Sequence, residues 1–365
     1  MKKKYLFVVP SLSKGGAERV VSILASELVK RNRNAVIVTH FRTEKEYPIN
    51  NDVEVVCLSN LNETEYREKM SAIYLIKLAR KLRKEIVRQN PDYILPFLWT
   101  TCVRTDFALM GLSLKERVIQ TVRNNPTVFP QNSVMKKYRN RLVQKSRLTI
   151  VQNKQQKQYF PEAQWEKIKV LPNPVSLKLL QVQRCEDKSQ FKVVGVGRLE
   201  TQKNFDLLID AVAMVSEKYE NIRLEIYGEG SLEKQLQEHI DRINLGRVAF
   251  LKGRSSDYNE IYGGASAFVL SSDFEGMPNT LLEAMAIGLP CISTDCPTGP
   301  SDIIEDGKNG ILVPTGDKNR LEQALENLIE QNELRLSLSK AAKQTIIMNY
   351  TPEKITQRFI EICEL

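Results

Sequence analysis

The sequence predicts an α/β protein of two domains, each with a parallel β-sheet covered by helices. Its length of 365 residues is typical of two domains. Short apolar runs alternate with helical stretches along most of the chain, which is the pattern of a parallel sheet. This alternation restarts after a polar segment with two prolines at 172–190. We therefore expect a first domain at 1–171, a linker at 172–190 and a second domain at 191–350.

The composition favours a folded protein without a membrane span. Hydrophobic residues make up 42% of the chain, and no run approaches the ~20 apolar residues that cross a bilayer. The basic start and the apolar run Tyr5–Val9 resemble a signal peptide, but the run is shorter than the ~7–15 residues needed, so we interpret it as a first strand. The six cysteines are scattered without a Cys-x-x-Cys pair, which favours free cytosolic thiols over a metal site.

The net charge of +9 is concentrated in the N-terminal half. Residues 67–88 carry eight basic and two acidic side chains on a helical pattern, and residues 136–147 carry six basic and no acidic ones. In the first stretch, the apolar residues from Met70 to Ile86 fall mostly on one side. A basic amphipathic helix can lie on an anionic membrane, held by ~1 kcal/mol per Lys or Arg. The alternative is a solvated outer helix of the first domain.

The first domain begins with a strand at 4–10, a Gly15-Gly16 turn and a helix whose buried face starts at Val20. The turn lacks the Gly-x-Gly-x-x-Gly pattern, so nothing favours a nicotinamide cofactor. Two glycines let the backbone approach a bulky ligand without a Cβ clash, although a simple turn would use them too. Further strands are predicted at Ala35–Thr39, Val53–Leu58, Tyr93–Phe97, Val118–Val122 and Leu148–Val151.

Polar residues follow the predicted strand that ends at Val122. Arg123 and Asn124 should lie at the carboxyl end of the sheet, where α/β proteins bind ligands, so they are candidate substrate contacts. The only histidines are His40 and His239. Neither histidine lies near Arg123 and Asn124 in the sequence, and we interpret both as structural or surface residues.

The second domain begins with a strand from Phe191 that ends at Gly195–Gly197. Arg198 and Lys203 follow, five residues apart. A planar guanidinium and a point-like ammonium at one strand end suit a diphosphate, although either could be an ordinary surface charge. Further strands are predicted at Arg223–Tyr227, Val248–Leu251, Ala265–Leu270, Cys291–Thr294 and Ile311–Val313.

The most informative stretch is 272–290, which reads as the end of a strand, a Glu-Gly-Met-Pro loop and a helix that stops at Gly288. The N-terminus of such a helix presents unpaired N–H groups and a positive dipole end, which favour phosphate. Seven residues separate Glu275 in the loop from Glu283 in the helix. Carboxylates accept hydroxyl hydrogen bonds, so the combination suggests a nucleotide sugar, with two surface acids as the alternative.

The stretch EGMPNTLLEAMAIGLP resembles the signature of retaining glycosyltransferases of family 4, whose fold is called GT-B. GGAERVV, around Gly15 and Gly16, and the GxGRLxxxKN spacing, which includes Arg198 and Lys203, are similar to that family's donor loops. The resemblance covers nearly the whole chain, is strongest over 191–315 and weakens over 40–170. It implies two Rossmann-like domains facing across a cleft, with residues 351–365 crossing back to the first domain.

The resemblance also implies residue roles. Glu275 would bind sugar hydroxyls, and Arg198 and Lys203 would neutralise the leaving diphosphate, which makes these three the candidate catalytic residues. Glu283 would bind the ribose. The other donor-binding candidates are Gly15, Gly16, Arg254, Gly276, Met277, Asn279, Thr280 and Leu281. Arg123 and Asn124 are candidate acceptor contacts, and the histidine of the family has no counterpart. No Asp-x-Asp motif occurs, so neither a metal nor another cofactor is expected.

The acceptor is expected from the family and from the basic N-terminal half. Bacterial members with a GGAERV opening often build capsule, exopolysaccharide, O-antigen or protein glycans on polyprenyl diphosphate lipids. The expectation is a cytoplasmic enzyme, peripheral on the inner membrane face, that transfers a hexose or N-acetylhexosamine from a UDP-sugar to a lipid-linked saccharide. One alternative is a cytosolic transferase with a soluble acceptor. A nucleic-acid-binding protein is disfavoured, because the basic runs hold few aromatic residues.

Overall fold

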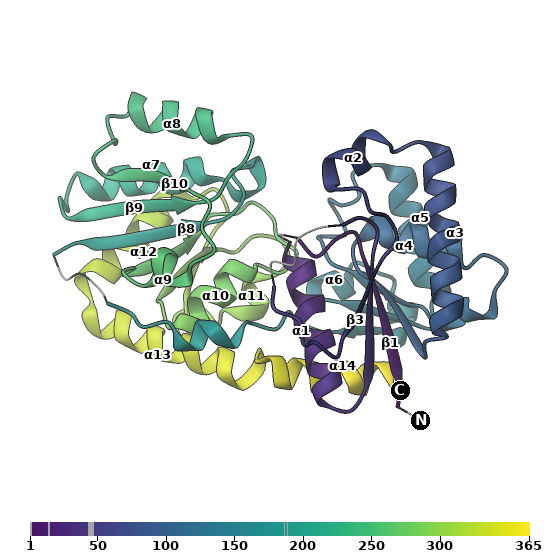
Figure 1. The fold of residues 1–365 in the computed structure, drawn as a ribbon. Helices are drawn as coiled ribbons and strands as arrows, with labels where there is room; N and C mark the ends of the chain where they lie inside the picture. The colour runs from purple at the N-terminus through teal and green to yellow at the C-terminus, as the bar shows by residue number, and fades with distance from the viewer. Residues whose placement is uncertain (1, 14, 43–46, 186, 188) are drawn as a thin grey trace. The chain divides into compact units, whose positions relative to one another are not determined.

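The computed structural model describes residues 2–13, 15–42, 47–185, 187 and 189–365, and the chain forms two compact units (Figure 1). The first unit comprises Met1–Pro174 and Pro352–Leu365, and the second comprises Val175–Thr351. The chain therefore returns to the first unit at Pro352, where α14 (Pro352–Cys363) begins.

The linker predicted at 172–190 is wrong, because the units divide between Pro174 and Val175. The short 3₁₀ helix η3 (Leu177–Gln181) buries Leu179 completely in the second unit. Arg184 also belongs to the second unit, where its guanidinium donates to the carbonyl oxygen of Gly288 at 2.9 Å. The polar composition of this segment therefore reflects a surface layer of the second unit rather than a free connection.

The first unit contains two parallel sheets that are joined by one β-bridge. A four-stranded sheet in the order β3-β2-β1-β4 meets a three-stranded sheet in the order β5-β6-β7 through a parallel bridge between Ile94 and Val118. β7 was not predicted. The strands are β1 (Lys4–Val9), β2 (Asn34–Thr39), β3 (Glu54–Cys57), β4 (Tyr93–Pro96), β5 (Ile119–Val122), β6 (Leu148–Val151) and β7 (Ile168–Val170).

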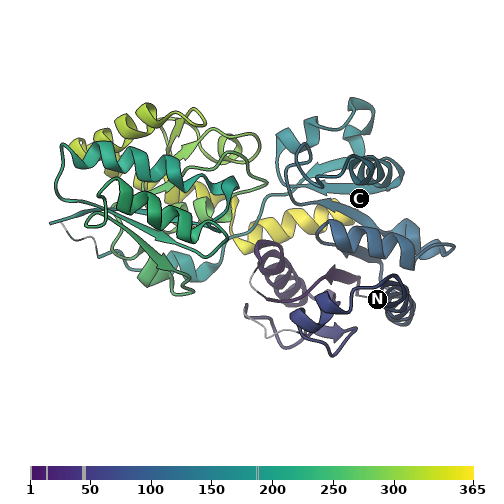
Figure 2. The ribbon, with the colours of Figure 1, turned by 90° about the horizontal axis from the view of Figure 1, so that it is seen from above.

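Helices cover both faces of the first unit's larger sheet. Tyr5 and Phe7 pack on one face with α1 and α14, and Leu6 and Val8 pack on the other with α3. α14 lies beside α1, and its Phe359 stacks on Phe7 with ring centroids 5.9 Å apart (Figures 1 and 2). The helices are α1 (Gly16–Lys30), α2 (Glu63–Glu68), α3 (Ala72–Gln89), α4 (Trp99–Ala108), α5 (Ser133–Lys145), α6 (Lys154–Gln158), η1 (Ser113–Arg117) and η2 (Glu162–Lys167).

The second unit has one parallel sheet in the order β10-β9-β8-β11-β12-β13. Alternate residues face opposite cores: Val193 packs with α7 and α12, and Val194 packs with α10. The strands are β8 (Phe191–Val196), β9 (Ile222–Tyr227), β10 (Ala249–Gly253), β11 (Ala267–Leu270), β12 (Cys291–Thr294) and β13 (Ile311–Val313). The helices are η4 (Thr201–Lys203), α7 (Phe205–Ser216), α8 (Glu233–Arg242), α9 (Tyr258–Tyr262), α10 (Asn279–Ile287), α11 (Pro300–Ile303), α12 (Lys318–Glu330) and α13 (Asn332–Asn349).

The basic helix is shorter than the predicted stretch, and two of its apolar residues are exposed. It was expected over 67–88, but α3 starts at Ala72, because the Ser71 side chain caps it by accepting a hydrogen bond from the Tyr74 N–H. Of the apolar residues on this helix, Ile73 and Ile76 are 69% and 53% exposed, whereas Leu78, Leu82 and Ile86 are buried. Across the described residues, no helix combines the length and apolar composition needed to cross a membrane.

His40 is structural, as expected, and lies completely buried after β2. Its Nδ1 lies 2.5 Å from Nη1 of Arg104. Burial, together with the positive charge of Arg104, lowers the pKa of His40 to about 3. The imidazole is therefore neutral in the folded protein and accepts the hydrogen bond from Arg104.

This buried imidazole should make the first unit sensitive to acid. Below pH ~6.5 the unfolded chain binds a proton at His40 that the folded chain does not, so the free energy of unfolding falls with pH. Between pH 7 and pH 5 this loss should be about 2 kcal/mol. His40→Asn keeps a hydrogen-bond acceptor but cannot titrate, so it should remove that part of the loss, as measured by urea unfolding at both pH values. Equal losses in the two proteins would contradict the assignment.

Candidate functional site

The first part of the site is the turn after β8, which is packed backbone to backbone against the turn after β9. A Cβ on Gly228 would lie 1.8 Å from the carbonyl oxygen of Gly197, and a Cβ on Gly230 would lie 2.3 Å from that of Leu199. Glycine is therefore required at both positions. Arg198 lies within this rigid turn, and its side chain is exposed and forms no ion pair with any described residue.

Lys203 and Glu275 form a buried ion pair at the same edge of the sheet. The Lys203 Nζ lies 2.6 Å from Oε1 of Glu275, and the two side chains are only 13% and 7% exposed. The Ser272 hydroxyl also donates to Oε1, at 2.8 Å. Oε2 receives only a long contact of 3.5 Å from Gln202 among the described residues. Because a carboxylate oxygen has two lone pairs, Oε2 retains capacity for hydroxyl donors.

Hydrogen bonds tie the turn that follows β8 to the turn that follows β11. The Asp273 N–H donates to the Gln202 carbonyl at 2.9 Å, and the Ser271 hydroxyl donates to the Lys203 carbonyl at 2.9 Å. The Asn204 side-chain amide donates to Asp273 at 2.8 Å. β8 and β11 are adjacent parallel strands, so their carboxyl ends meet at this edge. Neighbouring strands thus bring Lys203 and Glu275 together from positions 72 residues apart.

A third turn, after β12, supports the loop of Glu275 from behind. The Thr298 hydroxyl donates to the Glu275 carbonyl oxygen. Gly299 has a φ of +106° and packs so closely that a Cβ would lie 2.7 Å from Cδ of Pro278. Cys296, beside them, is inert as a nucleophile, because burial raises the pKa of its thiol to about 12 and the charge of Glu275 adds to the shift.

The helix α10 contributes its N-terminus and Glu283. The hydroxyl of Thr280, in its first turn, is buried and has no hydrogen-bond partner among the described residues. Glu283 is buried and accepts a hydrogen bond from the Tyr262 hydroxyl at 2.9 Å. The side chains of Leu281 and Met277 pack into the core, so these two candidates offer only backbone groups to a ligand.

Several candidates belong to other turns of the chain. Arg254 is exposed after β10, which is separated from β8 by β9. Gly15 and Gly16 belong to the first unit, where a Cβ on Gly15 would lie 1.8 Å from Oε2 of Glu18. The Glu18 carboxyl thus folds back over the glycine turn, and burial raises its pKa. Lys14, in the same turn, lies outside the described residues.

The two acceptor candidates differ in burial. Arg123 is 8% exposed, lies over the Phe97 ring at 5.0 Å and donates through Nη2 to Oδ1 of Asn173. Asn124, the next residue, is exposed.

Sequence reasoning missed the residues that hold the cluster in place. Gln202, Ser272 and Thr298 orient Glu275 or its loop, and Tyr262 contacts Glu283. Ser272 directly precedes the recognised loop and could have been suspected from its place at a strand end. The roles of Thr298 and Tyr262 depend on tertiary packing, which local sequence does not reveal.

Two domain families together match residues 14–345. Residues 14–179 match the family described as Glycosyltransferase Family 4, and residues 180–345 match Glycosyl transferases group 1. The two units have the GT-B fold, with two Rossmann-like domains. The chain belongs to the family 4-like glycosyltransferases, which confirms the predicted family and fold class.

Known proteins with similar sequences or structures are glycosyltransferases or have their fold. An uncharacterised glycosyltransferase of Methanocaldococcus jannaschii is 29% identical in an alignment that covers 72% of each chain. The GalNAc-α-(1→4)-GalNAc-α-(1→3)-diNAcBac-PP-undecaprenol α-1,4-N-acetyl-D-galactosaminyltransferase of Campylobacter jejuni is 27% identical over 93% of each chain. The Anabaena protein HepE, solved with UDP and glucose, superposes with a TM-score of 0.81 over 99% of each chain at 18% identity.

The buried ion pair should stabilise the second unit as well as shape the site. Lys203→Met leaves the buried Glu275 carboxylate without its cation, so the free energy of unfolding should fall by ~3–5 kcal/mol. The matched control is Lys218→Met, which breaks a more exposed pair with Glu326 at 2.6 Å. The control should cost far less, because solvent screens the exposed Lys218 ammonium. Urea unfolding followed by circular dichroism measures both, and equal losses would contradict a buried pair.

Proposed function

We propose that the protein is a retaining glycosyltransferase that moves a hexose or N-acetylhexosamine from a nucleotide diphosphate sugar to a lipid-linked saccharide. The observation that carries this proposal is the buried pair of Lys203 and Glu275 at the edge of the sheet where Arg198 follows β8 and where the loop after β11 leads into α10. This edge combines two cations and a helix N-terminus, which suit a diphosphate, with carboxylate oxygens, which suit sugar hydroxyls.

Each part of this cluster has a proposed task. The bond between the anomeric carbon and the diphosphate breaks, the acceptor oxygen bonds to that carbon on the same face, and the acceptor proton leaves with the nucleotide diphosphate. Arg198, Lys203 and the first turn of α10 stabilise the charge that develops on the leaving group. Glu275 Oε2 holds sugar hydroxyls, and Glu283 holds the ribose. In this scheme the fixed cations take the place of a metal ion.

UDP is the proposed nucleotide. HepE, which shares the fold, was solved with UDP and glucose. The exposed turns after β9 and β10, including Arg254, are the proposed contacts of the base, mainly through backbone groups. Gly15 and Gly16, in the first unit, are proposed donor contacts by their resemblance to the family's glycine loop.

The proposed acceptor is a saccharide on a polyprenyl diphosphate lipid, bound by the first unit with Arg123 and Asn124. The Campylobacter jejuni relative, which aligns over 93% of the chain, is named for such an undecaprenol-PP acceptor. α3 supports a membrane location, because its exposed residues include Lys77, Arg80 and Lys84 together with Ile73 and Ile76. We propose a protein that acts at the inner face of the cytoplasmic membrane without spanning it.

The donor class can be identified by thermal shift with UDP-, GDP- and ADP-sugars. We expect the UDP series to stabilise the wild type. Arg198→Ala should weaken binding about 10- to 100-fold, because a hydrogen bond to a charged group contributes ~1.5–3 kcal/mol. Its own melting temperature should not change, because Arg198 is exposed and has no ion-pair partner among the described residues.

The matched control for the donor screen is Arg247→Ala. Arg247 is also exposed but precedes β10, at the opposite edge of the same sheet. The Arg247→Ala variant should bind the nucleotide sugar as tightly as the wild type does. No stabilisation by any nucleotide sugar would count against the proposed function.

The membrane proposal can be tested by sedimentation with vesicles of phosphatidylglycerol and phosphatidylcholine in equal parts. Replacing Lys77, Arg80 and Lys84 by Gln should reduce binding about 100-fold at low salt, since each contributes ~1 kcal/mol near anionic lipid. The control replaces the exposed Lys234, Lys252 and Lys340 of the second unit by Gln, with the same change in net charge. A wild type that stays in the supernatant at moderate salt would instead favour a soluble acceptor.

A further inference from the structure

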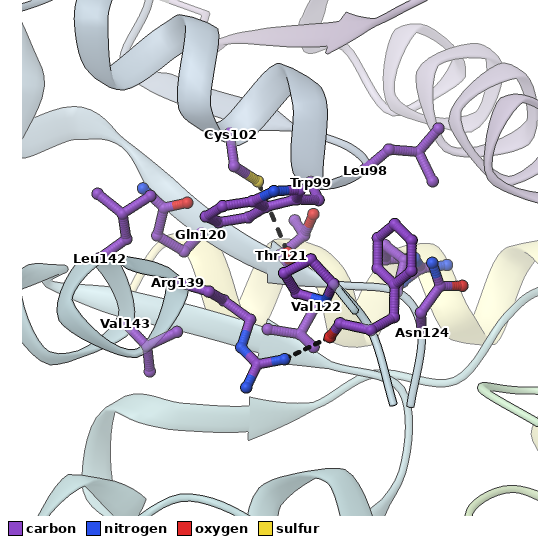
Figure 3. A pocket seen from close by; sticks show the side chains of 13 residues that line it. Leu98, Trp99, Cys102, Gln120, Thr121, Val122, Asn124, Arg139, Leu142 and Val143 are labelled. Atoms are coloured by element: carbon purple, nitrogen blue, oxygen red, sulfur yellow. Dashed lines mark hydrogen bonds between the residues drawn. The ribbon is translucent and has the colours of Figure 1, made fainter. Parts of the chain in front are cut away.

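The first unit contains a pocket next to the carboxyl end of β5. Its walls come from β5, α4, α5 and the loop between β5 and α5 (Figure 3). The Trp99 ring lies across the pocket, with Arg139 on the opposite wall. Trp99 is half-buried, and its ring is fixed edge-on against Tyr138 with centroids 5.9 Å apart. Phe129 adds a second aromatic ring, which is 40% exposed.

The pocket also contains a buried cation with unused donors. Arg123 is one of its lining residues, and only Nη2 of its guanidinium has a hydrogen-bond partner, the side chain of Asn173. Nε and Nη1 are buried and have no partner among the described residues. Burial lowers the pKa of Arg123 to about 9, so it is still charged at neutral pH. Within the described part of the chain, no carboxylate forms an ion pair with it. A buried charge in this state is destabilising unless an anion joins it.

Arg139, which lines the same pocket, differs from Arg123 because all of its guanidinium nitrogens donate hydrogen bonds within the protein. Its Nη1 donates to the carbonyl oxygens of Pro126 at 2.7 Å and Phe129 at 2.5 Å. Its other nitrogens donate to the side chain of Asn140, and it lies over the Tyr159 ring at 4.9 Å. Every part of this guanidinium is used to hold the loop after β5. The contrast indicates that Arg123 has a different task.

The remaining polar groups of the pocket suit a sugar. The side-chain amides of Gln120 and Asn124 line it, and the structure gives neither a hydrogen-bond partner among the described residues. Amides both donate to and accept from hydroxyls, and the apolar face of a sugar ring packs on an aromatic ring. Leu98, which precedes Trp99, has a φ of +75°. A bulky residue rarely adopts this conformation, and such strain is often found at ligand sites.

We propose that this pocket is the acceptor subsite and that it takes a sugar residue carrying an oxyanion, a carboxylate or a phosphate. The sugar ring packs against Trp99 and Phe129, Gln120 and Asn124 bind its hydroxyls, and the oxyanion accepts hydrogen bonds from Nε and Nη1 of Arg123. The inference rests on the proposed transfer to a saccharide acceptor. It goes further by stating that the accepting sugar, or the one next to it, is acidic.

The test is fluorescence titration of the full chain in a Trp165→Phe background, where Trp99 is the remaining tryptophan. The probes are glucuronate, its neutral analogue glucuronamide, glucose 6-phosphate, glucose and inorganic phosphate. We expect glucuronate or glucose 6-phosphate to bind at least 10-fold more tightly than glucose. Tighter binding of glucuronate than of glucuronamide would show, without any variant, that the charge of the carboxylate is recognised. Comparing glucuronate with glucose 6-phosphate then shows whether the site prefers a carboxylate or a phosphate.

Variants then locate the charge that is recognised. Arg123→Gln should remove the preference for the charged sugar, whereas Arg141→Gln, which removes an exposed charge from α5, should retain it. Should Arg123→Gln fail to fold, Arg123→Lys keeps the charge and should retain a weakened preference. Equal binding of charged and neutral sugars by the wild type, no binding of any probe, or equal binding of inorganic phosphate and glucose 6-phosphate would overturn the proposal.

The donor assay keeps the two proposals separate. UDP-sugar stabilisation of Arg123→Gln should equal that of the wild type, because Arg198, Lys203, Glu275 and Glu283, the proposed contacts of the nucleotide sugar, all belong to the second unit. A wild type that binds glucuronate but no nucleotide sugar would contradict the proposed function and leave the acidic subsite standing. A wild type that binds UDP-sugars but shows no preference among the acceptor probes would support the proposed function and contradict the acidic subsite.

Discussion

The second unit depends on one electrostatic constraint, the burial of Glu275 against Lys203. A carboxylate that is 7% exposed is stable only where a cation and hydrogen-bond donors surround it. Lys203 and Ser272 supply them at 2.6 and 2.8 Å, and both positions follow strands of the same sheet. The tightly packed glycine turns after β8 and β9 and the turn after β12 are what keep this arrangement rigid. The same residues therefore stabilise the loops and present the site.

The strands could be predicted because most are short apolar runs bounded by polar residues, and the family-level fold was confirmed. β7 was missed because it is only three residues long and has a lysine in its centre. The linker was placed wrongly because polarity marks exposure to water, and it does not distinguish a free connection from a segment packed on a helix.

The candidate site was predictable only in part, for a related reason. Parallel topology implies that Arg198, Lys203 and Glu275 share one edge, since each follows a strand. Whether any two of them touch depends on strand order, and the adjacency of β8 and β11 is not encoded in either segment alone. The pocket near Arg123 could not be predicted from the sequence, because its walls come from three separate elements, α4, β5 and α5. The burial of Arg123 is a property of the packing between these elements.

The place of α14 in the fold has a consequence for how the protein is made. Phe359 and Ile355 are fully buried in the core of the first unit, although they follow the whole of the second unit in the chain. The second unit is contained entirely within Val175–Thr351, so all of its sequence is translated before the first unit has its last helix. During synthesis, the face of the first sheet that α14 covers stays open to water or to a chaperone. The first unit therefore matures after the second, and a chain that stops at Thr351 lacks the helix that closes the first unit's core.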